Sequence, residues 1–185
     1  MREVQEAALD LFEAYGYEAV SVEAIAASAG VSAPTIYRHF GTKERIVLWD
    51  DYDPDLLVAI SGHAGRLGPL AAIEAGLIES LDVVYGTDAK RVLRRARLMV
   101  ATPELRLANA PLMAQLRAEL GSVLETSYRT LSTQQADLLA GVVVVALENA
   151  IGRWMETRGK TRLQEHFSDA FADLRAVVLT QGAST

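Results

Sequence analysis

The sequence feature that most constrains the fold is the stretch from Ser21 to Lys43, which predicts two short helices joined by a tight turn. Ser21 can cap the first helix and Ser32 the second, because a serine hydroxyl accepts hydrogen bonds from the free N–H groups of an opening turn. Gly30 lies between them, where a residue without a Cβ turns the chain at no steric cost. The apolar residues at helical spacing, which we expect to face the core, are Val22, Ile25 and Ala26 in the first helix and Ile36 and Phe40 in the second. This pattern predicts a helix-turn-helix.

The run AIAASAGVSAPTIYRHFGTKE, from Ala24 to Glu44, resembles the DNA-binding signature of TetR-family transcriptional regulators. It meets every fixed position of the family pattern I-A-x-x-A-G-V-S-x-x-x-[IL]-Y-x-[HY]-F-x-x-K. A glycine between two short helices is a weak signal, whereas the added segment I-Y-R-H-F-G-T-K is much more specific. The resemblance covers about the first 50 residues, and the remainder is similar to the family only in length and helical character. The phrase LWDDYDP, from Leu48 to Pro54, is also similar to phrases in regulators resembling those of mycofactocin gene clusters.

The resemblance and the geometry of the motif assign roles to side chains of its second helix. A short helix placed in the major groove presents its N-terminal residues to base edges, and an arginine there suits guanine O6 and N7. The residues expected to approach bases are Ala33, Pro34, Thr35 and Arg38. The resemblance implies phosphate contacts for Tyr37, His39 and Lys43, and Ser21 can add one from the preceding helix. The alternative is that Tyr37 and His39 are only packed or solvated.

The distribution of charge qualifies this interpretation. The chain has 185 residues and a formal net charge of −6, and residues 1–50 hold four basic and eight acidic side chains. A domain that binds duplex DNA usually has a basic footprint. The objection is weakened because the acidic residues fall mostly on the first predicted helix and its exit, and not on the second helix of the motif.

The whole chain is predicted to be all helical, with about nine helices and no segment that shows strand alternation. We expect a three-helix DNA-binding domain over residues 1–45 and a helical ligand-binding and dimerisation domain over residues 46–185. Outside the motif, the expected helices are 2–15, 43–60, 69–85, 88–102, 109–131, 133–158 and 161–181, with a glycine-rich loop over 61–69. Pro54 can interrupt the helix expected over 43–60, because a proline disfavours helical geometry at the residue before it, here Asp53.

Composition indicates the cellular compartment. The sequence has no cysteine, which excludes a disulfide framework and suits a reducing cytoplasm. The first residues, MREVQEAALDLF, lack the apolar core of a signal peptide. The longest apolar run, Leu138 to Leu147, is too short to span a bilayer. We therefore expect a soluble cytoplasmic protein without a membrane partner.

The last two predicted helices carry broad apolar faces, which include Val142 to Val145 and Phe167. Such a pair can bury itself against a symmetric copy and form a four-helix dimer interface. The resemblance favours this homodimer, whose two-fold symmetry suits the two half-sites of a palindromic operator in double-stranded DNA. The alternative is an ordinary core within one chain.

The resemblance also implies a small-molecule effector, because regulators of this type hold a cavity among their middle helices. The residues expected to line an apolar cavity are Leu77, Leu81, Met99, Leu116, Tyr128, Asn149 and Trp154, with plain core packing as the alternative for each. Asn149 or Glu148 is the expected polar anchor, with exposure to solvent as the alternative for Glu148. Asn149 is the more interesting of the two, because a polar side chain in an apolar helix needs a partner when it is buried. The basic cluster from Lys90 to Arg97 is interpreted as a solvated face, with a site for an acidic ligand such as an acyl-CoA as the alternative.

Catalysis and cofactor binding are not indicated by the sequence. The three histidines, His39, His63 and His166, have no second histidine or cysteine at metal-ligand spacing. The sequence contains no phosphate-binding P-loop, dinucleotide fingerprint or nucleophile elbow. We expect a repressor without enzymatic activity, cofactor or metal, which a largely apolar ligand releases from its operator. Two alternatives remain: a helical small-molecule-binding protein with a weak or vestigial DNA-binding unit, and a DNA-binding protein without a ligand.

Overall fold

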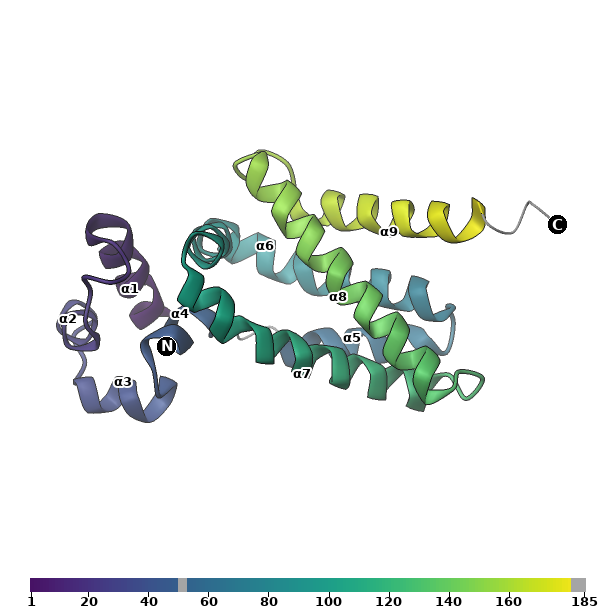
Figure 1. Ribbon diagram of the computed structural model, residues 1–185, viewed down its shortest axis with the longest axis horizontal. Helices are drawn as coiled ribbons and strands as arrows, with labels where there is room; N and C mark the ends of the chain where they lie inside the picture. The colour runs from purple at the N-terminus through teal and green to yellow at the C-terminus, as the bar shows by residue number, and fades with distance from the viewer. Residues whose placement is uncertain (50–52, 181–185) are drawn as a thin grey trace. The chain divides into compact units, whose positions relative to one another are not determined.

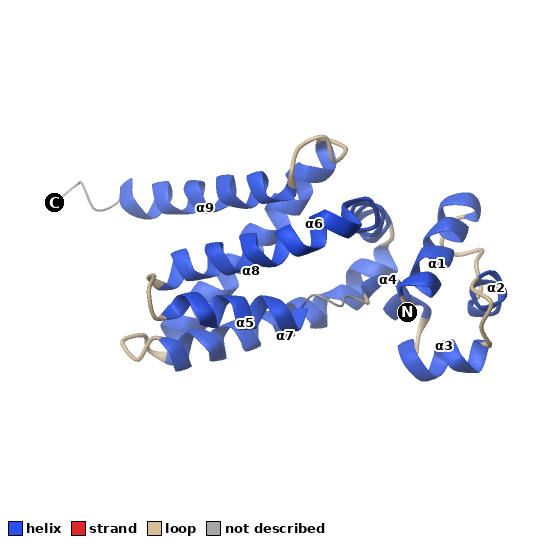
Figure 2. Cartoon of the chain, turned by 180° about the vertical axis from the view of Figure 1, so that it is seen from behind, coloured by secondary structure: helices blue, strands red, loops and turns tan. Residues whose placement is uncertain are grey.

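The computed structural model describes residues 1–49 and 53–180, and these ranges consist of helices and short connections without a strand (Figure 1). The helices of the described residues are α1 (Arg2–Tyr15), α2 (Val22–Ser28), α3 (Ala33–Phe40), α4 (Lys43–Leu48), α5 (Asp53–Ala64), α6 (Pro69–Ala101), α7 (Pro103–Ser127), α8 (Thr133–Glu156) and α9 (Leu163–Thr180). Figure 2 shows how little of the described chain lies in loops. The prediction of an all-helical fold with an N-terminal helix-turn-helix is confirmed.

The chain forms two compact units, and neither is continuous in sequence. We call Met1–Asp51 with Lys90–Pro111 the N-terminal unit, and Tyr52–Ala89 with Leu112–Thr185 the C-terminal unit. The predicted boundary at residue 45 does not separate them, because the end of α6 and the beginning of α7 belong to the N-terminal unit.

The core of the N-terminal unit explains this grouping. Its buried members are Val4, Ala8, Phe12, Tyr17, Val20, Val22, Ile25, Ala26, Ile36, Phe40, Ile46, Val47 and Leu105. Leu105 of α7 is completely buried, and Leu98 and Met99 of α6 pack against the same cluster. These three side chains therefore bind a distant part of the sequence to the helix-turn-helix.

Helices α6 and α7 differ from the sequence-based expectation. α6 runs from Pro69 to Ala101 without the expected break near residue 86. A single glycine costs a helix only about 1 kcal/mol relative to alanine, so Gly86 alone does not end it. Pro103 follows the end of α6 and is also the first residue of α7. A proline is tolerated in the first helical position, because the N–H that it lacks would have no partner within the helix.

The expected helix over 43–60 is interrupted, since α4 ends at Leu48 and α5 begins at Asp53. The expected reason is wrong, because Asp53, the residue before Pro54, is itself helical. Residues 50–52 of the phrase LWDDYDP lie outside the described residues. α5 then continues to Ala64, so only the end of the expected loop over 61–69 is not helical.

The C-terminal unit packs its helices around a second apolar core. The buried members are Ile60, Ile73, Leu77, Leu120, Leu124, Ala136, Ala140, Val143 and Phe171. α6 passes α5 very closely at Gly76, where a Cβ atom would lie 2.6 Å from Ile60 Cγ1 and 2.7 Å from the Ile60 backbone nitrogen. α8 and α9 pack against each other.

α8 is the one helix of the described residues that is long and apolar enough to cross a membrane, judged by length and composition alone. The mean hydropathy of its most apolar window is 1.5, although only 28% of that window is buried inside the chain. This differs from the expectation above, which considered only the run from Leu138 to Leu147. An apolar helix with so little cover from its own chain also fits a helix that packs against another protein chain.

Candidate nucleic-acid interface

Local sequence sets the orientation of α3. The Ser32 hydroxyl accepts a hydrogen bond from the Thr35 N–H at 3.3 Å, which caps the helix. Gly30, in the preceding turn, has a φ of 67°, a conformation that favours glycine. Ile36 and Phe40 are buried in the core of the N-terminal unit. The opposite side of α3 is therefore turned toward solvent.

The residues expected to approach bases lie at the start and on the outer side of α3. Pro34 and Arg38 are exposed, and Ala33 and Thr35 are half-buried. The Thr35 hydroxyl lies 2.8 Å from the Ser32 hydroxyl, so part of its bonding capacity is used within the cap. Arg38 has no hydrogen-bond or ion-pair partner among the described residues. Its five N–H donors are available to an acceptor outside the chain.

Three of the residues expected to contact phosphates lie around one shallow hollow. The hollow is bounded by the start of α2, the end of α3 and the start of α4, and Ser21, Tyr37 and Lys43 line it. Glu23 adds a carboxylate to the same hollow, which the sequence pattern did not single out. His39 is exposed on α3 but does not line the hollow.

Lys43 has a structural role that the family pattern did not indicate. Its ammonium group donates hydrogen bonds to the Tyr17 carbonyl at 2.9 Å and the Val20 carbonyl at 3.2 Å, and lies 4.2 Å from the centroid of the Tyr17 ring. The Tyr17 hydroxyl donates to Glu44 Oε1 at 3.0 Å. Burial, followed by this contact with Glu44, raises the pKa of Tyr17. Two of the three Lys43 protons thus join α4 to the turn between α1 and α2, and one remains for a phosphate.

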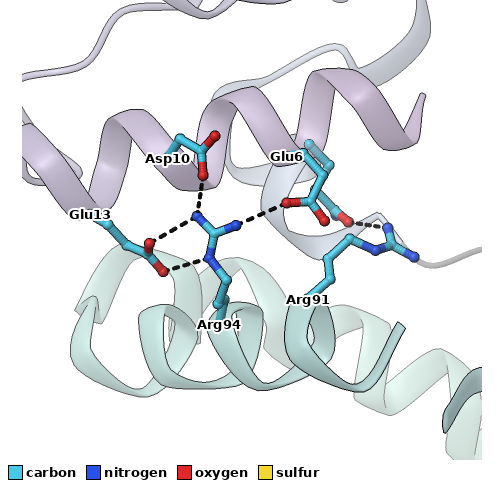
Figure 3. Close-up of polar contacts among 6 residues, drawn as sticks. Glu6, Asp10, Glu13, Arg91 and Arg94 are labelled. Atoms are coloured by element: carbon cyan, nitrogen blue, oxygen red, sulfur yellow. Dashed lines mark hydrogen bonds and ion pairs between the residues drawn. The ribbon is translucent and has the colours of Figure 1, made fainter. Parts of the chain in front are cut away.

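Three acidic side chains of α1 contact one arginine of the same unit. Figure 3 shows the Arg94 guanidinium of α6 between Glu6, Asp10 and Glu13 of α1. Its nitrogens lie 2.9 Å from Glu6 Oε2, 2.6 Å from Asp10 Oδ1 and 2.7 Å from Glu13 Oε1. The hydrogen bonds to Glu13 and Asp10 raise the pKa of Arg94 above its ordinary value.

The basic residues that the end of α6 and the beginning of α7 add to this unit remove most of the charge objection raised by the sequence. Residues 90–111 carry six basic side chains and one acidic side chain, whereas residues 1–51 carry four basic and nine acidic ones. The N-terminal unit is therefore neutral as a whole. The interpretation of the Lys90–Arg97 cluster as a solvated face is wrong at Arg91, which is 3% exposed, and at Arg94.

Gln5 connects α1, α4 and α6 and was not identified from the sequence. It is completely buried, and its Oε1 accepts a hydrogen bond from Arg91 Nη1 at 2.5 Å. Its Nε2 lies within hydrogen-bond distance of three carbonyls at the end of α4, those of Ile46 (2.7 Å), Val47 (3.2 Å) and Trp49 (2.9 Å). One amide therefore fixes the end of α4 to α1 and α6.

The residues expected around an effector are divided between the two units. Leu77 and Leu116 line a narrow apolar cavity in the C-terminal unit. Its volume of about 10 Å³ has room for roughly one water molecule. Tyr128 packs against the core of the same unit and donates its hydroxyl to the Leu67 carbonyl at 2.7 Å. Leu81 is half-buried on α6.

Neither Leu81 and Tyr128 nor the remaining three expected residues line this cavity. Trp154 is 1% exposed, and its indole N–H donates to the Thr161 carbonyl at 3.1 Å. Asn149 is exposed, and its amide donates to the Val145 carbonyl one turn earlier at 2.9 Å, so it needs no ligand as a partner. Met99 packs in the N-terminal unit, because α6 continues into that unit without a break.

Comparison with known proteins identifies the helix-turn-helix. Residues 5–48 match the family model for bacterial regulatory proteins of the tetR family. The helix-turn-helix is therefore similar to that of the tetR family. The putative mycofactocin biosynthesis transcriptional regulator MftR of Mycobacterium tuberculosis is 27% identical over 117 residues, which cover 62% of this chain and 58% of that protein. The HTH-type transcriptional regulator TcmR of Streptomyces glaucescens is 33% identical over 105 residues, covering 53% of this chain and 46% of that protein.

The chain thus spans about half the length of the curated relatives that it matches. Both are described as transcriptional regulators and neither as an enzyme, which agrees with the prediction that the chain has no enzymatic activity. The fold is similar to that of SmeT of Stenotrophomonas maltophilia, solved as a complex with triclosan. The TM-score is 0.66 with 15% identity, and the match covers 95% of this chain and 90% of that chain.

Proposed function

We propose that this chain is a TetR-family transcriptional regulator whose α3 reads base edges in the major groove of an operator. The observation that carries the proposal is the position of Arg38. Ile36 and Phe40 hold α3 on the core, and Arg38 lies exposed on its outer side without a partner among the described residues. An arginine in this setting can donate two hydrogen bonds to guanine O6 and N7 without breaking any contact of its own.

Replacement of Arg38 by alanine tests this role. We expect Arg38→Ala to lose preference for one base pair in each half-site, by about tenfold to a hundredfold, because a bidentate arginine contact discriminates by that amount. The measurement is the affinity for a bound duplex and for duplexes with single base-pair changes, at one salt concentration. Arg45→Ala is the control, since Arg45 is an exposed arginine of the same unit that was not assigned to bases. Full base preference in Arg38→Ala would exclude Arg38 as a reader.

We further propose that the protein is a homodimer formed through α8 and α9. Support comes from the apolar composition of α8 together with its low burial within the chain. Large apolar side chains are exposed on both helices, with Leu138 65%, Val145 55% and Val177 66% exposed. A second copy can cover such faces, and its two-fold symmetry presents two copies of α3 to the half-sites of a palindrome.

A charged residue on this surface tests the dimer. Val145→Glu is expected to convert the protein to a monomer at micromolar concentration, because an unpaired carboxylate cannot be buried in an apolar interface without a large cost. The measurement is the molar mass by analytical ultracentrifugation. Val58→Glu is the control, since Val58 is 72% exposed on α5. A Val145→Glu variant that remains a dimer would place the interface elsewhere.

The regulatory step that we propose is release from the operator by a largely apolar effector bound in the C-terminal unit. Support comes from the cavity lined by Leu77, Leu116 and their apolar neighbours, and from the solved complex of SmeT with triclosan. A ligand larger than one water must widen this cavity. It therefore favours a different helix arrangement, and it shifts the population by the difference between its affinities for the two arrangements. A repressor that acts on DNA in this way works in the cytoplasm.

A further inference from the structure

The hollow lined by Ser21, Tyr37 and Lys43, which are expected to contact DNA phosphates, also contains a hydrogen-bond acceptor. The Tyr37 hydroxyl, from α3, lies 3.4 Å from Glu23 Oε1, in the first turn of α2. Both residues are exposed, and both line the hollow with Ser21 and Lys43. The carboxylate therefore lies beside the donors that a phosphate would use.

Glu23 is held in its charged form at this position. Hydrogen bonds from its own backbone N–H and then from the Ser21 hydroxyl lower its pKa. Partial burial, followed by the charge of Glu23, raises the pKa of Tyr37. Near neutral pH the pair is thus a neutral phenol that donates to a carboxylate.

The other two donors of the hollow are engaged as well. The Ser21 hydroxyl accepts a hydrogen bond from the Ala24 N–H at 3.2 Å and donates one to the Glu23 carboxylate. Lys43 directs two protons to backbone carbonyls. A phosphate that enters the hollow must therefore take Tyr37 and Ser21 away from Glu23, and it must approach a like charge while doing so.

We propose that Glu23 competes with the DNA phosphate for the donors of this hollow and thereby limits the affinity of the chain for DNA. This inference rests on the proposed function, because it names a determinant within the same interface. The proposal predicts that Glu23 lowers the affinity of the protein for DNA of any sequence, since contacts to phosphates carry no sequence information.

The test compares two neighbouring carboxylates. Glu23→Gln is expected to bind a random-sequence duplex about three- to fivefold more tightly at fixed salt, the size of an exposed charge interaction. Glu18→Gln is the matched control, because Glu18 also lines the hollow but makes no contact with its donors. It is expected to change affinity less than twofold. In a Tyr37→Phe background the gain from Glu23→Gln should largely disappear, because the main donor to be released is absent.

Three results would overturn the proposal. An equal gain in Glu23→Gln and Glu18→Gln would show a general charge effect, and a gain that persists in Tyr37→Phe would exclude competition for the hydroxyl. Weaker binding by Glu23→Gln would show that Glu23 itself contacts DNA. If the unaltered protein binds no duplex, the proposed function fails as well.

A measurement without DNA distinguishes failure of the Glu23 proposal from failure of the proposed function. The absorbance titration of Tyr37, taken as the difference from Tyr37→Phe, should shift to lower pH in Glu23→Gln, because the carboxylate charge that opposes ionisation is gone. An unchanged titration would show that the contact between the two side chains does not form in solution.

Discussion

Replacing Gln5 with leucine is expected to destabilise the N-terminal unit by about 2–4 kcal/mol, because buried polar groups lose their partners while the side-chain volume is kept. The Gln5 amide is the point at which three carbonyls at the end of α4 and the Arg91 guanidinium meet. Leucine can neither donate to these carbonyls nor accept from Arg91. Since Arg91 is 3% exposed, its guanidinium cannot turn to water as compensation.

The two tryptophans allow the effect to be measured for one unit at a time. Trp49 belongs to the N-terminal unit and Trp154 to the C-terminal unit. In a Trp154→Phe background, denaturant unfolding followed by Trp49 fluorescence should show a lower midpoint for Gln5→Leu. The control is Gln134→Leu, which replaces an exposed glutamine in α8. Equal midpoints for the two variants would exclude the proposed role of Gln5.

Two identical substitutions, Gly76→Ala and Gly62→Ala, are expected to have opposite effects on the C-terminal unit. At Gly76 a Cβ would lie 2.7 Å from the Ile60 nitrogen and 2.8 Å from its Cα, so α5 must move away. We expect Gly76→Ala to lose about 1–3 kcal/mol, the usual cost of overpacking. Gly62, on α5, has no neighbour within 4 Å of the same position. Alanine there should gain about 0.5–1 kcal/mol, because it has the higher helix propensity.

The measurement uses the other tryptophan. In a Trp49→Phe background, Trp154 fluorescence during denaturant unfolding reports on the C-terminal unit, and the two variants should shift its midpoint in opposite directions. A stabilising effect of Gly76→Ala would mean that α5 and α6 do not cross this closely in solution.

The sequence predicted what depends on neighbours along the chain. Ser21 and Ser32 cap α2 and α3 as expected, and the apolar spacing correctly gave Ile36 and Phe40 as the buried side of α3. From this the exposed position of Arg38 follows, because a helix that buries one face exposes the other.

The parts that were missed depend on contacts between distant residues. Arg94 lies more than eighty residues from the carboxylates that surround it, and a basic cluster alone does not reveal such partners. The same holds for Gln5, whose main acceptors are backbone carbonyls of α4. α6 was predicted as two helices, over 69–85 and 88–102, although the glycine between them costs too little to end a helix. Met99 was consequently assigned to the wrong unit among the effector residues.

The family pattern indicated which residue types stand at the DNA-contacting positions, but not the hydrogen bonds that these side chains make within the chain. Lys43 matched a phosphate-contacting position, yet most of its protons fasten α4 to the turn before α2. A Lys43 variant would therefore change the stability of the N-terminal unit as well as its affinity for DNA. Arg38 and Tyr37 are the better pair for testing DNA recognition, because both are exposed and neither contributes to the core.

The most direct test of sequence-specific DNA binding is a selection of bound duplexes from a random library with the purified full chain. An Arg38→Ala, Tyr37→Phe double variant with an unchanged unfolding midpoint serves as the control. We expect the unaltered protein to enrich one palindrome whose half-sites are separated by about one helical turn, and the double variant to enrich none. Failure of the folded, unaltered protein to enrich any sequence beyond the double variant would contradict the proposal that α3 reads an operator.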